Sequence, residues 1–321
     1  MKMNQFEYAV ILLDDSAPSF CYYSVENREK ETMTEETLSR AIAFFMKEEY
    51  YATVVYGKEP PNDACMALLA EFPHTRIIPL PLAANTNSLD IYTVDFEDFE
   101  STLTELSPNK NLNFILRMNM GDVLLLADLL EHFCDRFIRL NVIFRDLPYA
   151  DEPLLNKFRL DLSYMSCLLL RMFTNEIYFE LNIATDRMTL CEMNNCNAGV
   201  THVTLAPNGN FYICPGFYYE NCSPVGSLEK GISIGNRHLF EYLHAPICNK
   251  CDCYQCKRCV YLNRRLTLEV NTPSHAQCVA SHHERNMSGF LLEKFQKRGL
   301  MINLPRIEPL FYLDPIEILE V

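Results

Sequence analysis

The hydrophobic pattern of the first 190 residues alternates between short apolar runs and longer segments of helical periodicity. Apolar runs of roughly four to eight residues between polar or turn residues predict strands, and apolar residues three and four positions apart predict amphipathic helices. We therefore expect strands at 8–13, 51–56, 76–80, 113–117, 137–144 and 177–183, with 89–94 as a further strand or an insertion. Helices are expected after Thr34, which is a plausible N-cap, and at 62–72, 122–133 and 152–173.

Strands that alternate with helices predict right-handed βαβ units around a parallel sheet. About six such units fit into residues 1–190, which predicts an α/β domain with an open or partial (βα)6 TIM-like barrel. In folds of this kind, functional sites lie at the C-terminal ends of the strands. Two loops at such positions stand out, at 20–23 after the first strand and at 56–60 after the second.

The pattern changes at residue 191, where a second, cysteine-rich domain is expected to run to residue 321. Pro207-Asn208-Gly209 between β-rich flanks predicts a hairpin that brings Cys196 and Cys214 to the same end. Residues 236–243 look helical, and Phe290, Leu291, Leu292 and Phe295 indicate a C-terminal helix.

Ten of the fourteen cysteines lie between Cys191 and Cys278, and five of them fall within Cys248–Cys259. Thiolates at two-residue spacing can converge on one metal centre, because a tight turn brings both sulfurs to one side. The candidate metal ligands are Cys191, Cys196, Cys214, Cys248, Cys251, Cys253, Cys256, Cys259 and Cys278. Cys222 has no partner in the pattern, and we expect it to be a bystander.

The N-terminal residues show no signal-peptide pattern, and no stretch is long and apolar enough to predict a membrane span, so we expect a cytoplasmic protein. In that compartment, clustered cysteines indicate metal binding rather than disulfides. The net charge of −14 comes from residues 1–190, because residues 191–321 hold 12 basic and 12 acidic residues of the chain's 28 and 42. The negative charge argues against nucleic acid as a partner.

The two loops of the first domain resemble motifs of the radical SAM superfamily, which carries CxxxCxxC after the first strand of a partial barrel and a GGEP-like motif after the second. Cys21, followed by two tyrosines, lines up with the last motif cysteine. Segment 57–60 matches the second motif with lysine for its second glycine. The resemblance implies that Gly57, Glu59 and Pro60 form a degenerate segment for the methionine end of S-adenosylmethionine.

The other two motif cysteines would fall on Asp14 and Pro18. Three thiolates hold the [4Fe–4S] cluster that cleaves S-adenosylmethionine in that superfamily, so a single cysteine predicts a pseudo-radical-SAM domain that keeps the scaffold without this chemistry. An active enzyme remains the alternative if folding brings other thiols, such as that of Cys65, to Cys21.

The second domain resembles the SPASM domain of radical SAM peptide-modifying enzymes, which holds two auxiliary [4Fe–4S] clusters. The resemblance implies one cluster on Cys191, Cys196, Cys214 and Cys259, and a second on Cys248, Cys251, Cys256 and Cys278, with Cys253 as an extra candidate. The inner spacings are one residue short of the SPASM pattern, and zinc also accepts such cysteine sets. His275, His282 and His283 flank Cys278, and we expect them to be surface or capping residues.

Together these features predict an accessory or degenerate peptide maturase, similar to bacterial CXXX-repeat peptide maturases. The expected partners are a ribosomally made precursor peptide and an intact radical SAM maturase, with neither nucleic acid nor membrane. A zinc-stabilised peptide-binding module is the alternative.

Overall fold

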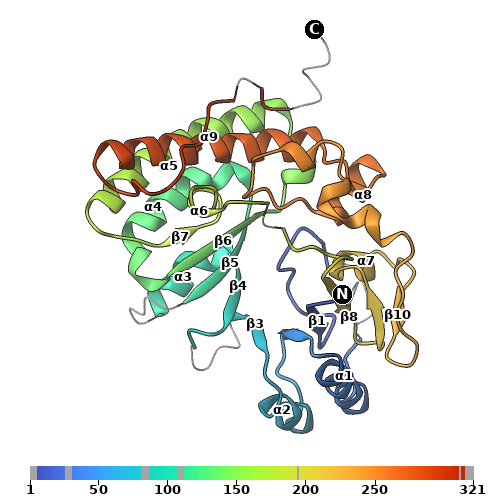
Figure 1. Ribbon diagram of the computed structural model, residues 1–321. Coiled ribbons are helices and arrows are strands. Elements are labelled where there is room, and N and C mark those ends of the chain that lie inside the picture. The colour runs from blue at the N-terminus through green and yellow to red at the C-terminus, as the bar shows by residue number, and fades with distance from the viewer. Residues whose placement is uncertain are drawn as a thin grey trace. The chain divides into compact units, whose positions relative to one another are not determined.

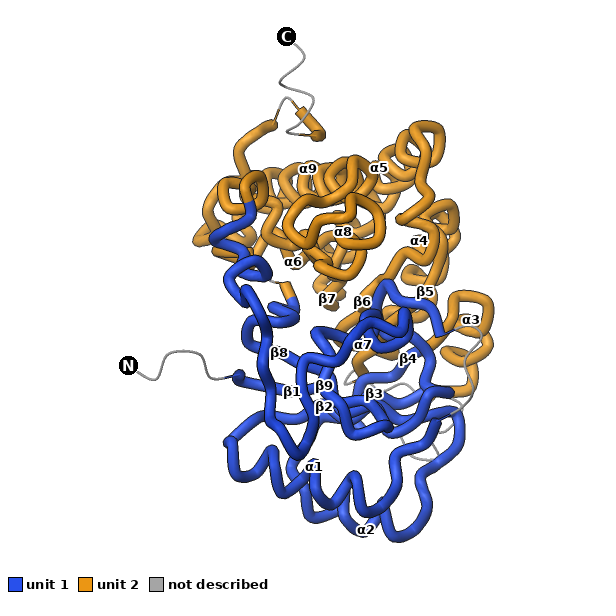
Figure 2. The backbone as a smooth tube through the Cα atoms, turned by 90° about the vertical axis from the view of Figure 1, so that its right-hand side faces the viewer, with its two compact units in different colours: residues 1–93, 196–245 blue, residues 94–195, 246–321 orange. Residues whose placement is uncertain are grey.

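The computed structural model describes residues 6–25, 31–80, 87–106, 112–193, 195–310 and 312–314 (Figure 1). It is a mixed α/β protein whose longer strands pair in parallel. The chain forms two compact units, each built from two segments (Figure 2). The first unit holds residues 1–93 and 196–245, and the second holds residues 94–195 and 246–321. These compact units differ from the two consecutive domains, 1–190 and 191–321, that the sequence predicts. The domain boundary at 190/191 therefore stays a prediction.

The sheet of the first unit has β1 at its centre, between two parallel neighbours. β1 pairs with β2 from Tyr8 opposite Tyr51, and with β8 from Tyr8 opposite His202. β2 is followed by β3 and the start of β4, and β8 by the antiparallel β9, β10 and β11. The elements are β1 (Tyr8–Leu12), α1 (Glu35–Glu48), β2 (Tyr51–Val55), α2 (Asp63–Ala70), β3 (Thr75–Pro79), β4 (Ile91–Asp95), β8 (His202–Leu205), β9 (Asn210–Tyr212), α7 (Pro215–Tyr219), β10 (Gly226–Ser227) and β11 (Gly231–Ile232).

The second unit contains the parallel strands β5, β6 and β7 and two long helices, α5 and α9, which lie side by side. Phe173 of α5 stacks on Phe295 of α9, with ring centroids 5.5 Å apart, and both rings are buried. The elements are α3 (Phe96–Glu105), β5 (Asn113–Met118), α4 (Val123–Phe133), β6 (Arg139–Phe144), α5 (Glu152–Thr174), β7 (Glu180–Leu181), α6 (Asp186–Thr189), α8 (Val260–Thr267) and α9 (His275–Lys297).

Most of the predicted elements form within a few residues of the expected bounds. Thr34 caps α1 by accepting a hydrogen bond from Thr37 N, and Leu38, Ala41 and Phe45 are buried on one face of that helix. The hairpin also forms, because Gly209 takes the left-handed backbone (φ 75°) that this turn requires between β8 and β9.

Several elements differ from the expectation, and the short helices α6, α7 and α8 are among those that were not expected. The predicted strand 177–183 narrows to the two residues of β7. The helix expected at 236–243 is split into short 3-10 turns, Arg237–Phe240 and Tyr242–His244, after Asn236 adopts a left-handed backbone. Helix α3 was not predicted, since only Phe99 and Leu103 mark its buried face.

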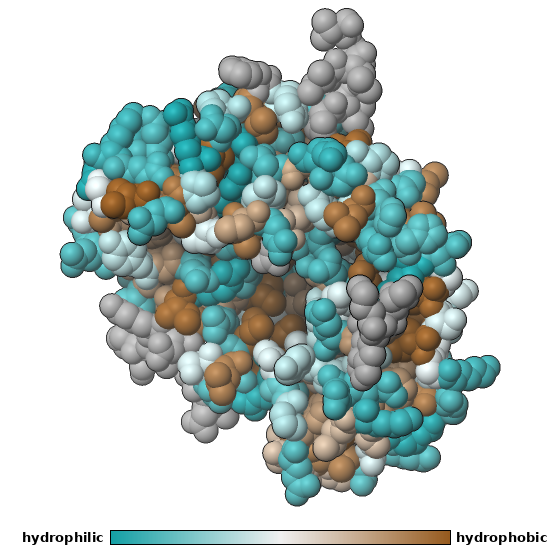
Figure 3. All heavy atoms as spheres, in the orientation of Figure 1, coloured by the Kyte–Doolittle hydropathy of each residue, from teal (hydrophilic) through white to brown (hydrophobic). Residues whose placement is uncertain are grey.

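Apolar side chains form the interior of each unit, and hydrophilic residues cover much of the face drawn in Figure 3, where apolar residues form small groups. Among the described residues, the helices are either too short or too polar to cross a membrane.

Candidate functional site

The loop after β1 carries two buried carboxylates. Asp14 and Asp15 are 7% and 5% exposed. Asp14 accepts a hydrogen bond from the backbone of Ser16, and Tyr218 donates its hydroxyl toward Asp15 Oδ2 at 3.1 Å and Glu31 Oε2 at 3.0 Å. Burial and then the charge of Asp15 raise the pKa of Tyr218, so its hydroxyl stays protonated and serves these carboxylates as a donor.

Gly57 lies directly against the side chain of Asp14. A Cβ atom at Gly57 would stand 2.6 Å from Asp14 Cγ, closer than side chains pack, so any larger residue would displace the Asp14 carboxyl group. The backbone N–H of Lys58 donates to Ser16 Oγ at 2.9 Å. The fold thus brings together the two loops that the sequence singles out, while Glu59 and Pro60 are exposed.

Cys21, Cys196 and Cys214 share one neighbourhood of the first unit. Burial is the main cause that raises the pKa of the Cys214 thiol, and the charges of Cys196 and Cys21 raise it further. Cys196 and Cys214 come close as the hairpin predicts. Cys65 lies in α2, where burial and the charge of Glu35 raise the pKa of its thiol.

The residues of the β1 loop alone do not fit the cluster that cleaves S-adenosylmethionine, although the fold brings Cys196 and Cys214 into the neighbourhood of Cys21. That cluster needs three thiolates, and the loop offers Cys21 together with Asp14 and Pro18, of which proline has no ligand atom. Asp14 is already engaged by Gly57 and the Ser16 backbone.

The second unit gathers thiols from the dense cysteine segment and from α9. Burial, followed by the charge of Cys256, raises the pKa of Cys278, and Cys248 and Cys251 contribute further. Burial likewise raises the pKa of Cys256 to about 12, with contributions from Cys248 and Cys251. These four thiols, predicted to form one set, are therefore within electrostatic range of one another.

The other predicted set is divided between the units. Cys196 and Cys214 belong to the first unit, and Cys191 and Cys259 belong to the second. Cys191 is exposed, whereas Cys259 is buried at the start of α8.

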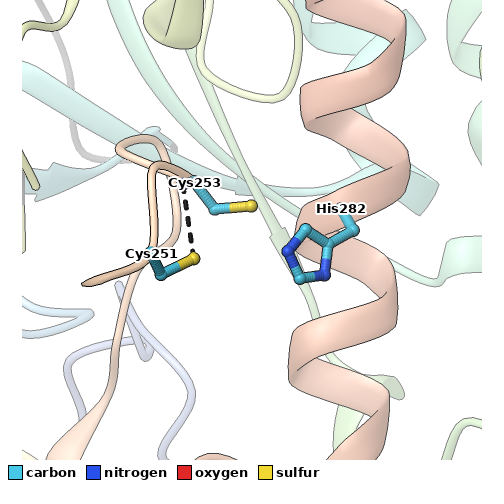
Figure 4. A group of neighbouring side chains, drawn as sticks. All are labelled: Cys251, Cys253 and His282. Carbon is cyan, nitrogen blue, oxygen red and sulfur yellow. Dashed lines mark hydrogen bonds between the residues drawn. The ribbon is translucent and has the colours of Figure 1, made fainter. Parts of the chain in front are cut away.

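The most compact ligand group consists of Cys251, Cys253 and His282 (Figure 4). Their ligand atoms all lie within 4.8 Å of one another, which holds for no other trio of cysteine, histidine or carboxylate side chains among the described residues. Cys253 and His282 are buried, at 1% and 2% exposure, and Cys253 N donates to Cys251 Sγ at 3.4 Å. Hydrogen bonds with Cys253 and, as a smaller effect, with His282 lower the pKa of Cys251 to about 5, against the opposing effect of burial.

Asp252, between the two cysteines, is held by two buried arginines. Arg285 donates from Nε to Asp252 Oδ1 at 2.7 Å and from Nη2 to Oδ2 at 2.5 Å. Arg187 donates from Nη2 to the same Oδ2 at 2.9 Å. Burial alone would raise the pKa of Asp252, but these partners lower it below its usual value. The carboxylate thus stays ionised and fixes the backbone that presents the two thiols.

The expectation that His282 and His283 lie at the surface is wrong, because their exposed fractions are 2% and 5%. His275, the first residue of α9, binds the carboxylates of Glu152 and Asp314 at 2.7 and 2.9 Å. The signal for His282 was its position four residues after Cys278 on a predicted helix, which places both on one face.

The chain matches no protein-family model and no curated protein. Among solved structures it is similar to native anSMEcpe with bound AdoMet, with a TM-score of 0.58 and 15% identity over 92% of this chain and 98% of that one. Native anSMEcpe with bound AdoMet and the Kp18Cys peptide gives a TM-score of 0.57 at 12% identity, with the same coverage. Streptococcus suis SuiB bound to S-adenosylmethionine gives 0.51 at 12% identity, over 85% of this chain and 77% of that one.

These likenesses show a shared fold.

Proposed function

We propose that this chain is a degenerate or accessory peptide maturase that does not cleave S-adenosylmethionine itself. The observation that carries the proposal is the β1 loop, where Asp14 packs against Gly57 and Cys21 supplies the loop's single thiol. A scaffold shared with AdoMet-bound structures but without three motif thiols suits a protein that keeps the binding surfaces and has lost the radical step.

The finer assignments belong to the same proposal. The βα units form a partial barrel, and the segment from residue 191 forms a SPASM-like domain. Gly57, Glu59 and Pro60 are what remains of the cofactor segment. The protein works in the bacterial cytoplasm beside an intact radical SAM maturase, on a cysteine-repeat peptide of the CXXX type.

The decisive experiment is a cleavage assay on anaerobically purified protein, reduced and supplied with S-adenosylmethionine. We expect no 5′-deoxyadenosine above the level of a no-protein control, because the loop lacks the cluster's ligands. Catalytic production of 5′-deoxyadenosine by the isolated chain would refute the proposal in favour of an active enzyme with an unusual site.

A cavity in the second unit supports a peptide partner. Its volume is about 750 Å³, and it is lined by both apolar side chains and carboxylates from α3, α4 and the residue before α4. Leu125 and Leu129 are among its apolar residues, and Asp122 and Asp128 are among its acidic ones. A peptide segment with apolar and basic side chains would match this lining.

A labelled synthetic peptide of repeated CXXX units, flanked by basic residues, tests this cavity by fluorescence anisotropy. We expect Leu125→Asp to weaken binding and Leu160→Asp, an exposed leucine of α5 outside the cavity lining, to leave it unchanged. Equal binding by both variants would remove the cavity from the proposal.

We propose iron–sulfur clusters as the metal content of the cysteine region, two of the [4Fe–4S] type by the resemblance. Four thiols support this proposal because they lie close enough to influence one another's pKa: those of Cys248, Cys251, Cys256 and Cys278. Two such clusters would give anaerobic protein about eight irons and equivalent sulfide, and a single cluster would give about four. The short distances at Cys251, Cys253 and His282 favour, for that part of the region, the alternative of a zinc-stabilised module.

A further inference from the structure

Helix α9 presents a stripe of polar side chains toward the dense cysteine segment. Cys278, Ser281, His282 and Arg285 follow one another at intervals of three, one and three residues, so they lie on one face of the helix. Ser281 accepts a hydrogen bond from Gln255 through its backbone oxygen at 2.6 Å, and Arg285 binds Asp252. These contacts fix the cysteine segment along the helix on both sides of His282.

The orientation of His282 is that of a metal ligand. Its Nδ1 is hydrogen bonded to the backbone oxygen of Leu313, which places the ring proton on Nδ1 and leaves a lone pair on Nε2. Nε2 is buried and makes no hydrogen bond of ordinary geometry with the described residues. The ring extends from α9 toward the sulfur atoms of Cys251 and Cys253 (Figure 4). A buried ring nitrogen costs free energy unless something binds it, and the side chain of Cys251, from the same group, interacts with His282.

Two features prepare the thiols for a cation. The N–H of Cys253 donates to Cys251 Sγ, which supports a negative charge on that sulfur. Asp252 accepts two hydrogen bonds from the buried Arg285, and this fixes the backbone between the two cysteines. The pair of thiols is therefore pre-organised, and its geometry does not depend on flexible side chains.

The distances favour one ion over a cluster. Ligands of a tetrahedral zinc ion stand about 3–4 Å apart, because Zn–S bonds measure about 2.3 Å and Zn–N bonds about 2.0 Å. Thiolates on different irons of a cluster stand farther apart, because each iron holds its own thiolate. Ligand atoms within 4.8 Å of one another in Cys251, Cys253 and His282 match the first case. A neutral imidazole with two thiolates is also a donor set typical of zinc.

We propose that Cys251, Cys253 and His282 are three ligands of a single zinc ion. The thiols of Cys248, Cys256 and Cys278, in the same unit, are those available for the fourth position. This assignment goes beyond the proposed function in two ways. A site for one zinc ion replaces the second predicted cluster, and a histidine is a ligand where the cysteine pattern predicts only thiolates. It stands whether or not the protein binds a peptide.

Metal analysis of full-length protein, purified anaerobically without chelator, tests the assignment. We expect one zinc per chain in the wild-type protein. His282→Gln and Cys253→Ser should lose it, with a fall in zinc affinity larger than the roughly 10–100-fold that loss of a supporting hydrogen bond typically costs. His283→Gln is the matched control, because His283 is the adjacent buried histidine of the same helix and does not belong to the group of Cys251, Cys253 and His282.

A second variant separates a ligand role from a packing role. His282→Cys should retain zinc, because thiolate replaces imidazole as a ligand, although it leaves a larger gap in packing than glutamine does. Cobalt substitution adds a spectroscopic measure, since the thiolate-to-cobalt band should change in His282→Gln and His282→Cys and stay unchanged in His283→Gln.

Two results would overturn the proposal. One is zinc affinity in His282→Gln within threefold of the wild-type value. The other is protein that holds iron and sulfide without zinc and whose cluster spectrum is the same in His282→Gln and His283→Gln. The cleavage assay has no bearing on either result, so failure of the zinc site and failure of the proposed function remain distinguishable.

Discussion

Removing the carboxylate of Asp252 should destabilise the second unit more than any exposed charge change. Asp252→Ala takes away both hydrogen bonds of Arg285 and the one from Arg187. The side chain of Arg285 is 2% exposed, so solvent does not replace the lost partner. A buried cation would then stand without its anion.

The magnitude follows from the burial of the two arginines. Breaking a buried ion pair by removing one partner typically costs about 3–5 kcal/mol. Asp252 itself is 33% exposed, and Arg187 keeps its position over the ring of Tyr254 at 4.6 Å. We therefore expect the lower end, about 3 kcal/mol, which is a large part of the roughly 5–15 kcal/mol that stabilises a typical domain. Asp252→Asn keeps one acceptor oxygen, so we expect it to lower the free energy of unfolding by about half as much.

Urea unfolding under anaerobic conditions measures this difference, once with the purified protein and once after chelator treatment. Comparison of the two series separates the ion pair from any metal that the flanking cysteines bind. Glu293→Ala is the control, because it removes an exposed carboxylate that bonds Lys297 on the same helix, and it should change the free energy of unfolding little. A loss below about 1 kcal/mol for Asp252→Ala in the chelated protein would refute the reasoning.

Three further changes probe the first unit. The double variant Asp14→Cys with Pro18→Cys should raise the iron content by about four per chain, because it adds two thiols to that of Cys21 and so completes the three of the motif; unchanged iron and sulfide would contradict this. Gly57→Ala should lower the free energy of unfolding by about 1–3 kcal/mol, because the added methyl group meets the side chain of Asp14. A thermal midpoint equal to that of the wild type would contradict this, because it would mean that the loop adjusts to the methyl group. Arg76→Met should cost about 3 kcal/mol, because Asp90 is buried and bonded to Arg76 at 2.6 and 2.7 Å, and an unchanged urea midpoint would count against it.

The strands and most helices could be predicted because their signals are local. β1 and β2 are apolar runs, and α1 carries its cap at Thr34 with a buried stripe at Leu38 and Phe45. The sequence does not predict α3, because two buried residues, Phe99 and Leu103, are too few to show the apolar periodicity of a helix among acidic neighbours.

The candidate site was predictable only in part, because its ligands come from two distant segments. The spacing of Cys251 and Cys253 indicated a metal. The role of His282 depends on burial against a segment about thirty residues earlier, and on Leu313 about thirty residues later, which local pattern does not reveal. In the same way, the contact of Asp14 with Gly57 arises from the pairing of β1 with β2.

The parallel pairing of β1 with β8 also bears on synthesis of the chain. Tyr8 lies opposite His202, so a ribosome must add nearly two hundred residues, in roughly 10–40 s, before β1 gains its second neighbour. Until then one edge of β1 is open, with side chains such as Ala9 and Ile11 that are fully buried in the finished fold. A nascent or truncated chain that ends before β8 therefore presents an apolar edge to other chains. Chaperone binding and aggregation of such fragments should therefore concentrate at β1.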